Sequence, residues 1–365
     1  MDSMGKIADL SFYNGKRVLV TGHTGFKGTW MCKMLSMLGA EVIGYSLDPP
    51  TEPNLFDISG IKNRIISVIG DVRNLADLKA VILKYKPQII FHMAAQPIVR
   101  ESYKNPVYTY ETNVLGTVNV LEAIRCCSDV RSFVNVTTDK VYRNNEWEWG
   151  YRENDVLGGD DPYSSSKSCS ELVTASYKQS FFEKSETAIS TCRAGNVIGG
   201  GDFAKDRIIP DCVRAMEQGN EIIVRNPNSV RPYQHVLDPL YAYLMVACCQ
   251  YENKARYEGC YNVGPDECGY VTTGKLVDMF CASWGDNAGW KHAAEADPPH
   301  EACYLKLDCS RIKNVFSWQP RWNIAEAVEK TVEWSKAYLQ KKDTVSVMES
   351  QILSFLNTVR DCDKI

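Results

Sequence analysis

The sequence of 365 residues lacks the segments that mark membrane and exported proteins. Its longest uninterrupted apolar run, Leu240 to Cys249, is about half of the ~20 residues that a membrane-spanning helix needs. Charged residues are scattered through the first 20 positions, where a secretory signal would have a continuous apolar region. The sequence therefore predicts a protein that stays in the cytoplasm.

Spacing typical of metal sites is also missing. The 14 cysteines form no CxxC pair, and most lie in apolar segments, which is typical of buried thiols in a chain of this size. The five histidines, at positions 23, 92, 235, 292 and 300, are too dispersed for a structural zinc site. We expect no metal.

The chain has little excess charge of either sign. Its formal net charge is −4, with 44% apolar and 24% charged residues, an ordinary globular composition. Such a balance gives no electrostatic basis for binding nucleic acid or an anionic membrane. Small-molecule chemistry is favoured instead.

Short β-branched segments alternate with segments of helical spacing through the first half of the chain. The expected strands are 17–21, 41–46, 65–69, 88–92, 132–137 and 188–192. The expected helices among them include 26–38, 75–85 and 106–127. This alternation predicts an α/β protein with a Rossmann-type, doubly wound parallel sheet.

After about residue 195 the alternation loosens. Turn-rich segments at 199–203, 225–229 and 296–300 indicate a second, smaller lobe of mixed α/β structure. The helices expected in this part of the chain are 208–219, 273–283, 324–340 and a terminal amphipathic helix at 344–359.

The first expected strand runs into a glycine-rich turn and then a helix, in the segment Thr21-Gly22-His23-Thr24-Gly25-Phe26-Lys27-Gly28. A turn of this kind places backbone N–H groups and the positive end of a helix dipole where a pyrophosphate binds. The alternative is a tight strand-to-helix turn without a ligand. The strand before it, the helix after it and a second strand ending near Ser46 favour dinucleotide binding.

The ends of the second and third strands indicate which dinucleotide is bound. Ser46 and Asp48 can reach the adenosine ribose hydroxyls, which favours NAD over NADP. Lys27 is the counter-signal, because a cation in the glycine loop could meet a 2′-phosphate. Asp71 and Val72 stand at the adenine-binding position of such a fold, although Asp71 is equally suited to a turn or a helix cap.

The fourth strand ends in Ala94-Ala95-Gln96, where small side chains allow the backbone to approach a cofactor closely. His92, on the same strand, is expected to be a packed polar core residue and not a catalyst. Asn113 begins a helical segment in which Gly116 allows tight helix contact.

The most specific pattern is Tyr163-Ser-Ser-Ser-Lys167. On a helix the two side chains lie one turn apart, so the ammonium can lower the pKa of the phenol and hold a ribose diol. A phenolate so placed can take a proton from a hydroxyl. Alone, such a pair is usually a surface feature, but the upstream glycine loop and the strand-end hydroxyl of Thr138 indicate catalysis.

Together these motifs resemble the extended short-chain dehydrogenase/reductases that act on nucleotide sugars, from Lys16 to about Lys341. Dehydratases of this family carry Thr-Asp-Glu at the sheet end, whereas this chain has Thr138-Asp139-Lys140, which resembles those acting on CDP-glucose. Other segments that carry the resemblance are 23–28, 94–103, 193–202 and 231–236.

The resemblance implies conversion of CDP-D-glucose to CDP-4-dehydro-6-deoxy-D-glucose in deoxysugar biosynthesis, with a tightly held NAD recycled in each turnover. Tyr163 would take the proton of the C4 hydroxyl, and Asp139 would protonate the departing C6 hydroxyl. Lys140 stands where relatives have a carboxylate that removes the C5 proton. We expect Lys140 to remove that proton as a neutral amine; the alternative is a cation that stabilises the enolate-like charge.

The resemblance also implies the roles of individual residues. The expected catalytic residues are Thr138, Asp139, Lys140, Tyr163 and Lys167. The expected cofactor-binding residues are Gly22, Thr24, Gly25, Phe26, Lys27, Gly28, Ser46, Asp48, Asp71, Val72, Ala94, Ala95, Gln96, Asn113, Thr137, Tyr163, Lys167 and Arg193. The expected substrate-binding residues are Gln96, Asn196, Arg207, Arg231, Tyr233, His235 and Tyr304.

The resemblance divides the chain into three parts. Residues 1–195, with 231–262 returning to them, are expected to form the NAD-binding domain. Residues 196–230 and 263–345 form the nucleotide-sugar-binding lobe, and 346–365 a C-terminal helix and tail. A homodimer or tetramer is expected, paired through the helices that begin near Pro106 and Pro162.

Two other functions remain open on the sequence. A nucleotide-sugar 4-epimerase would share Tyr163 and Lys167 but would not need Asp139 and Lys140. A non-catalytic NAD-binding protein would be expected to have lost the tyrosine, the lysine or the acid, and all three are present.

Overall fold

The computed structural model describes residues 9–285, 288–293 and 304–358 of the chain. Its centre is a sheet of seven strands in the order β11-β6-β5-β4-β1-β2-β3, and every neighbouring pair in it is parallel. The strands are β1 (Arg17–Thr21), β2 (Glu41–Ser46), β3 (Ile66–Ile69), β4 (Ile89–His92), β5 (Ser132–Thr138), β6 (Ala188–Ala194) and β11 (Cys260–Val263). The predicted doubly wound sheet is confirmed.

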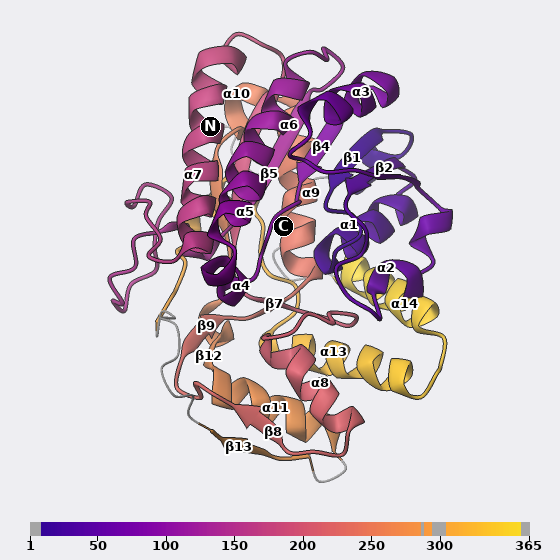
Figure 1. Ribbon diagram of the computed structural model, residues 1–365, viewed down its shortest axis with the longest axis vertical. Coiled ribbons are helices and arrows are strands. Elements are labelled where there is room, and N and C mark those ends of the chain that lie inside the picture. Colours follow the sequence, from indigo (N-terminus) through magenta and orange to yellow (C-terminus); the bar gives the residue numbers. More distant parts are fainter. Residues whose placement is uncertain (1–8, 286–287, 294–303, 359–365) are drawn as a thin grey trace.

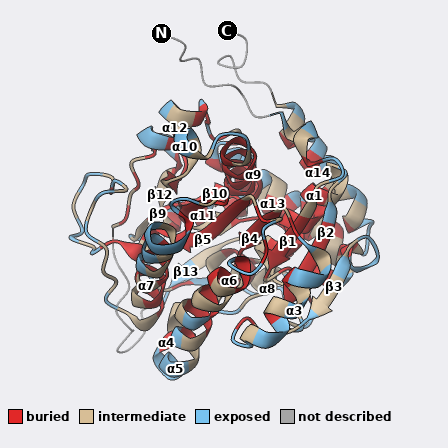
Figure 2. Cartoon of the chain, turned by 90° about the horizontal axis from the view of Figure 1, so that it is seen from above, coloured by how far each residue is buried: buried red, intermediate tan, exposed pale blue. Residues whose placement is uncertain are grey.

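Apolar side chains cover both faces of this sheet, because successive residues of a strand point to opposite sides. On β1, Val18 and Val20 belong to one core while Leu19 belongs to the other. Helices α1 and α9 pack on the first face, and α3 and α6 on the second. Figure 2 shows the central strands buried between these layers.

The helices follow the strands in the expected alternation. They are α1 (Phe26–Met37), α2 (Leu55–Ile58), α3 (Leu75–Tyr85), α4 (Val99–Lys104), α5 (Pro106–Tyr110), α6 (Gly116–Ile124), α7 (Pro162–Tyr177), α8 (Ile208–Glu217), α9 (Leu237–Glu252), α10 (Lys254–Tyr257), α11 (Thr273–Trp284), α12 (Ser310–Phe316), α13 (Ile324–Leu339) and α14 (Thr344–Asn357). Short 3-10 turns lie at Leu10–Tyr13, Ile61–Asn63, Asp139–Val141 and Glu267–Gly269. The helix expected at 106–127 is divided, since a π-helical segment, Glu111–Leu115, separates α5 from α6.

A smaller lobe lies below the carboxyl ends of the central strands (Figure 1). It has a hydrophobic core of its own, which includes Ile222, Phe280 and Val328. Its short strand pairs are β8 (Ile222–Val224) with β13 (Trp290–His292), and β9 (Val230–Pro232) with β12 (Tyr270–Thr272). A third pair is β7 (Val197–Ile198) with β10 (Gln234–His235). The exact division of the chain into domains stays a prediction.

The terminal helix α14 packs against the core of its own chain. Met348, Ile352 and Phe355 join the larger sheet core, and Glu349 lies 2.7 Å from the buried ammonium of Lys33 in α1. The expected turn at 296–300 and the residues after 358 lie outside the described part. No described helix is long and apolar enough to cross a membrane, and no described cluster of His, Cys, Asp or Glu could hold a metal ion.

Candidate active site

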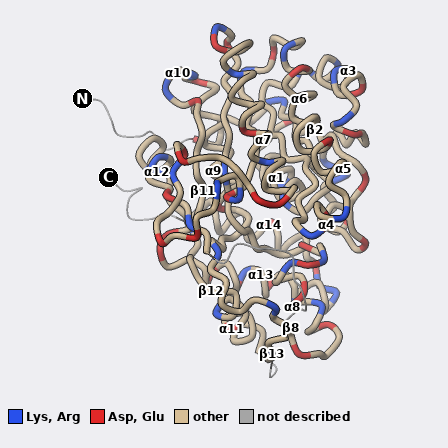
Figure 3. Tube along the Cα trace, turned by 60° about the vertical axis from the view of Figure 1, so that its left-hand side comes forward, with Lys and Arg blue, Asp and Glu red and all other residues tan. Residues whose placement is uncertain are grey.

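A cavity of about 1350 Å³ lies between the carboxyl ends of the central strands and the smaller lobe. This is where open α/β sheets bind their ligands. Residues of both charges gather around it, near α4 and α8 (Figure 3). The predicted site residues that line it are Gly22, Thr24, Gly25, Phe26, Lys27, Gly28, Ser46, Asp48, Asp71, Val72, Ala94, Ala95, Gln96, Thr137, Thr138, Lys140, Tyr163, Lys167, Asn196, Arg207, Arg231 and Tyr233.

The glycine loop between β1 and α1 has the shape that a dinucleotide requires. Gly22 has a φ of +77°, and a Cβ there would lie 2.8 Å from the backbone nitrogen of Ala94. At Gly28 a Cβ would lie only 2.1 Å from the carbonyl oxygen of Gly22. Gly25 caps α1 without a side chain, so the N–H groups of the first turn have no side-chain acceptor. These residues fit a pyrophosphate at the helix N-terminus.

The end of β2 forms the next wall of the cavity. The hydroxyl of Thr24 donates to the carbonyl oxygen of Leu47 and lies 2.9 Å from the hydroxyl of Ser46. Asp48 lines the cavity and is exposed. Asp71 accepts hydrogen bonds from the backbone and guanidinium of Arg73, which lower the pKa of its carboxyl against the opposing effect of burial.

Tyr163 and Lys167 extend from α7 into the same cavity. Burial raises the pKa of Tyr163 to about 12, although its hydrogen bond to Thr138 acts in the opposite direction. Burial also lowers the pKa of Lys167 to about 8. The ammonium of Lys167 donates to the carbonyl oxygen of Val136, on β5, over 3.1 Å. Because the pKa of Tyr163 is about 12, its phenol is protonated at neutral pH.

Thr138, Asp139 and Lys140 stand where β5 ends in a 3-10 turn. The hydroxyl of Thr138 donates to Oδ1 of Asp139 over 2.9 Å. The Nζ of Lys140 lies 3.2 Å from the same oxygen and 3.3 Å from Oδ1 of Asn196. Asp139 is fully buried, and its Oδ2 has no hydrogen-bond partner in the described part of the protein. An acid and an amine are thus in contact beside the phenol of Tyr163.

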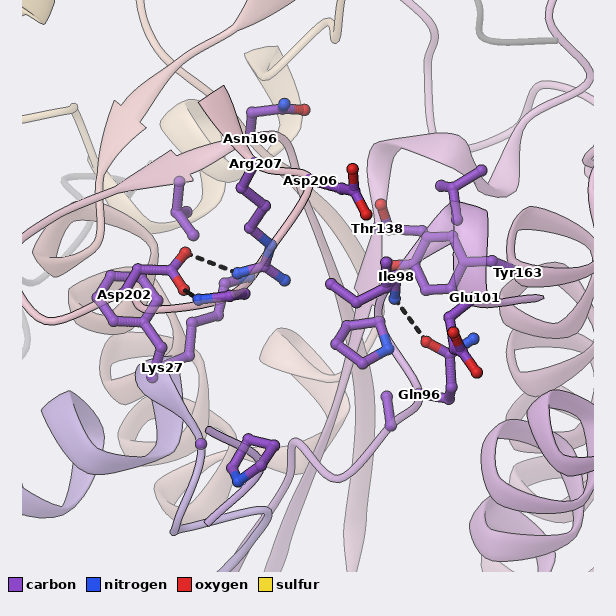
Figure 4. A pocket seen from close by; sticks show the side chains of 18 of the residues that line it. Lys27, Gln96, Ile98, Glu101, Thr138, Tyr163, Asn196, Asp202, Asp206 and Arg207 are labelled. Atoms are coloured by element: carbon purple, nitrogen blue, oxygen red, sulfur yellow. Dashed lines mark hydrogen bonds and ion pairs between the residues drawn. The ribbon is translucent and has the colours of Figure 1, made fainter. Parts of the chain in front are cut away.

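A second group of charges lies across the cavity, as Figure 4 shows for Lys27, Asp202 and Arg207. The guanidinium of Arg207 donates to Asp202 over 2.8 Å, and the attraction of that carboxylate raises the pKa of Arg207. Burial, and then the repulsion of Arg207 and Lys167, lowers the pKa of Lys27 to about 7. An anionic ligand placed here would meet an excess of positive charge.

The predicted residues Arg231 and Tyr233 come from the smaller lobe. Arg231 is largely buried, with its guanidinium donating to the carbonyl oxygen of Val230 over 3.0 Å. The hydroxyl of Tyr233 lies 3.0 Å from that of Thr273. Both residues line the cavity.

Five predicted residues lie away from the cavity wall. Arg193 is buried in β6, where its guanidinium donates to both carboxylate oxygens of Glu171. The ring of His235 is buried against Trp322, and burial lowers its pKa to about 3. Asn113 is buried in the segment before α6, and Tyr304 pairs with Val230 through the backbone. Asp139 also lies behind the wall, reached through Thr138 and Lys140.

Gln96 lines the cavity, but its side-chain atoms are used inside the protein. Its Oε1 accepts from the backbone of Ile98 over 2.6 Å, and its Nε2 donates to the hydroxyl of Thr109 over 2.9 Å. The sequence analysis missed Asp202, Arg225 and Thr273, which also line the cavity. Asp202 ends the glycine-rich segment 199–202, and the position of a carboxylate directly after three glycines was the available signal.

Comparison with known proteins places this cavity in a family. Residues 19–331 match the family described as GDP-mannose 4,6 dehydratase. The chain is 46% identical over 354 residues to a CDP-glucose 4,6-dehydratase of Salmonella typhimurium, covering 96% of this chain and 98% of that protein. It is 26% identical to a CDP-paratose 2-epimerase of Salmonella typhi, covering 88% of this chain and 99% of that protein.

Solved structures share the fold. A dTDP-glucose 4,6-dehydratase of Bacillus anthracis in complex with NAD superposes with a TM-score of 0.75 at 23% identity, covering 91% of this chain and 100% of that one. A UDP-glucose 4-epimerase of Thermotoga maritima with UDP-glucose has a TM-score of 0.76 at 19% identity, covering 88% and 99%.

Proposed function

The chain belongs to the GDP-mannose 4,6 dehydratase family, and from that premise we propose that it dehydrates CDP-glucose to CDP-4-dehydro-6-deoxy-glucose with a resident NAD. The observation that carries the proposal is the contact of Asp139 with Lys140 beside Tyr163. Epimerisation at C4 does not need an acid and a base for the loss of water. CDP is chosen because the 46% identical relative is a CDP-glucose 4,6-dehydratase.

The glycine loop, Ser46 and Asp48 would hold the dinucleotide, and Lys167 would reach its ribose. Bound NAD supplies the redox chemistry, accepting hydride from C4 of the sugar and returning it to C6. Lys27, Arg207 and Arg231 line the cavity and would bind the diphosphate of the substrate or cofactor, because lysine and arginine side chains make charge-assisted hydrogen bonds to phosphate oxygens.

Oxidation at C4 requires a base, yet the phenol of Tyr163 is protonated at neutral pH. The hydrogen bonds offer a solution. Tyr163 bonds to Thr138, and the single proton of the Thr138 hydroxyl points to Asp139. As Tyr163 takes the C4 proton, its own proton passes through Thr138 to Asp139. The oxidation step thereby produces the carboxylic acid that the dehydration step uses.

Protonated Asp139 no longer carries the charge that stabilises the Lys140 ammonium. Lys140 then loses a proton to water, and two N–H groups of the amine can still donate to Asp139 and Asn196. Its lone pair removes the C5 proton of the ketone, while the proton of Asp139 passes through the hydroxyl of Thr138, which lines the cavity, to the C6 hydroxyl, which leaves as water. Lys140 returns a proton to C5 after hydride reaches C6. Lys140 then takes a proton back from water, so that Tyr163, Asp139 and Lys140 all regain their starting states.

A substrate deuterated at C4 tests this proposal. We expect product from CDP-[4-²H]glucose to carry the deuterium at C6, within the same molecule. Recovery of CDP-galactose with deuterium still at C4 would contradict dehydration and favour an epimerase.

The assembly and location predicted from the sequence remain proposals. Exposed apolar side chains on α5, the π-helical segment Glu111–Leu115 and α7, namely Val107, Leu115 and Leu172, offer a surface to a second copy of the chain. Light scattering is expected to give at least twice the 41.1 kDa of one chain. A cytoplasmic location is expected as well, and fractionation of the producing cell tests it.

A further inference from the structure

A buried imidazole connects the strand before the glycine loop with helix α6. His92 lies at the end of β4, with Nδ1 at 2.8 Å from the hydroxyl of Thr21 and Nε2 at 3.2 Å from the hydroxyl of Thr117. All three residues are buried. Burial also lowers the pKa of His92 to about 3, so the ring is neutral under ordinary conditions.

The neighbours of the ring determine which nitrogen carries its proton. The Thr21 hydroxyl oxygen accepts from the backbone nitrogens of Met93 and Ala94, over 3.1 and 3.2 Å. Both its lone pairs are then used, so its proton must go to Nδ1 of His92. Nε2 therefore carries the ring proton and donates it to Thr117, whose own proton goes to the carbonyl oxygen of Asn113 over 2.7 Å.

The same chain of hydrogen bonds continues to the catalytic helix. Asn113 accepts from the backbone of Gln96 over 2.9 Å and donates to the hydroxyl of Ser166 over 2.8 Å. Ser166 in turn donates to the carbonyl oxygen of Tyr163 over 2.7 Å. One path thus joins β1, the turn after β4, α6 and α7.

The glycine loop and the turn after β4 lie in close contact. A single Cβ on Gly22 would lie 2.8 to 2.9 Å from backbone atoms of Met93 and Ala94. The turn after β4 therefore rests directly on the glycine loop, and a small displacement of either would change the cofactor cavity.

We propose that His92, as the neutral tautomer protonated on Nε2, is a positioning residue that holds the turn after β4 and the Tyr163 helix in register with the cofactor loop. Its side chain is buried and does not line the cavity. The expected loss of turnover in the variants rests on the proposed function. The tautomer of His92 and the expected change in NAD binding do not.

Two variants of similar size separate positioning from simple filling of space. His92→Gln keeps an acceptor for Thr21 and a donor for Thr117, whereas His92→Leu keeps neither. We expect the Leu variant to bind NAD about tenfold more weakly and to lose kcat with little change in KM for substrate. The Gln variant should stay within a few-fold of the wild type in both. Equal binding of NAD by the two variants, whether weakened or not, would overturn the proposal.

Nitrogen NMR of the ¹⁵N-histidine-labelled wild-type chain gives a reading that needs no variant and no activity. We expect His92 to show a protonated Nε2 and an unprotonated Nδ1 from pH 6 to 8. A proton on Nδ1, or titration within that range, would contradict the assignment even if the Leu variant failed to fold. If the dehydratase function were wrong, the NMR and NAD-binding results would still stand.

Discussion

The Nζ of Lys140 lies 3.2 Å from Oδ1 of Asp139, and the hydroxyl of Thr138 donates to the same oxygen over 2.9 Å. A carboxylate that is fully buried thus accepts from both an alcohol and an amine. Since Thr138 also bonds to Tyr163, a proton can move from the phenol to the acid without entering bulk water.

Lys140→Met should stop the reaction after oxidation. We expect turnover to fall about 10²- to 10⁴-fold, because the base for C5 is gone while the phenol remains. The measurement is solvent deuterium at C5 of substrate and product in D₂O. Lys275→Met, on the exposed face of α11, is the matched control and should behave as the wild type. Normal deuterium incorporation at C5 by Lys140→Met would remove Lys140 from this role.

Thr138→Val should break the path between Tyr163 and Asp139 with nearly unchanged side-chain volume. We expect kcat to fall about 10²-fold or more with a smaller change in KM, because the step lost is proton transfer. Thr138→Ser keeps the hydroxyl and should recover most of the rate. Similar rates for the Val and Ser variants would mean that the hydroxyl carries no proton.

Lys167→Met should make the protein more stable near pH 7, because burial disfavours the ammonium of Lys167 and lowers its pKa to about 8. The unfolded chain, with a pKa near 10.4, binds a proton more tightly. Wild-type stability therefore recovers as pH rises from about 8 to 10.4, and the advantage of the variant disappears. We expect a gain of about 3 kcal/mol at pH 7. Urea unfolding at pH 7 and 10 measures it, and a pH-independent difference would be the contrary result.

Arg193→Met should destabilise the fold by about 3–5 kcal/mol, because it leaves the buried carboxylate of Glu171 without its cation. The double variant Arg193→Met with Glu171→Met should recover much of this loss. Denaturant unfolding of the single and double variants is the measurement. Full stability with weakened NAD binding in Arg193→Met would show instead that the guanidinium acts on the cofactor.

Much of the sheet could be predicted from local sequence. β1 and β2 have the expected bounds, because each is a short segment with β-branched residues that is buried on both faces after its first residue. The break at Glu111–Leu115 could not, since the sequence there keeps helical spacing and the π-helical segment depends on packing against α7.

The site residues could be predicted where a short sequence motif defines them. They could not be predicted where the role depends on the direction in which a side chain points. The glycine loop and the strand-end residues line the expected cavity. Arg193, by contrast, stands on a strand that leads to the cavity but points to Glu171. Sequence spacing alone does not show on which side of a strand a cation finds its partner, because that partner is on another element.

The most direct test of the account is to incubate the purified protein with CDP-, dTDP-, GDP- and UDP-glucose, with and without added NAD. The 4-keto-6-deoxy product is followed by its absorbance in alkali. We predict product from CDP-glucose, with turnover before any NAD is added if the cofactor is retained. No ketone from any of the four, with CDP-galactose formed from CDP-glucose, would contradict the dehydratase function and the roles given to Asp139 and Lys140.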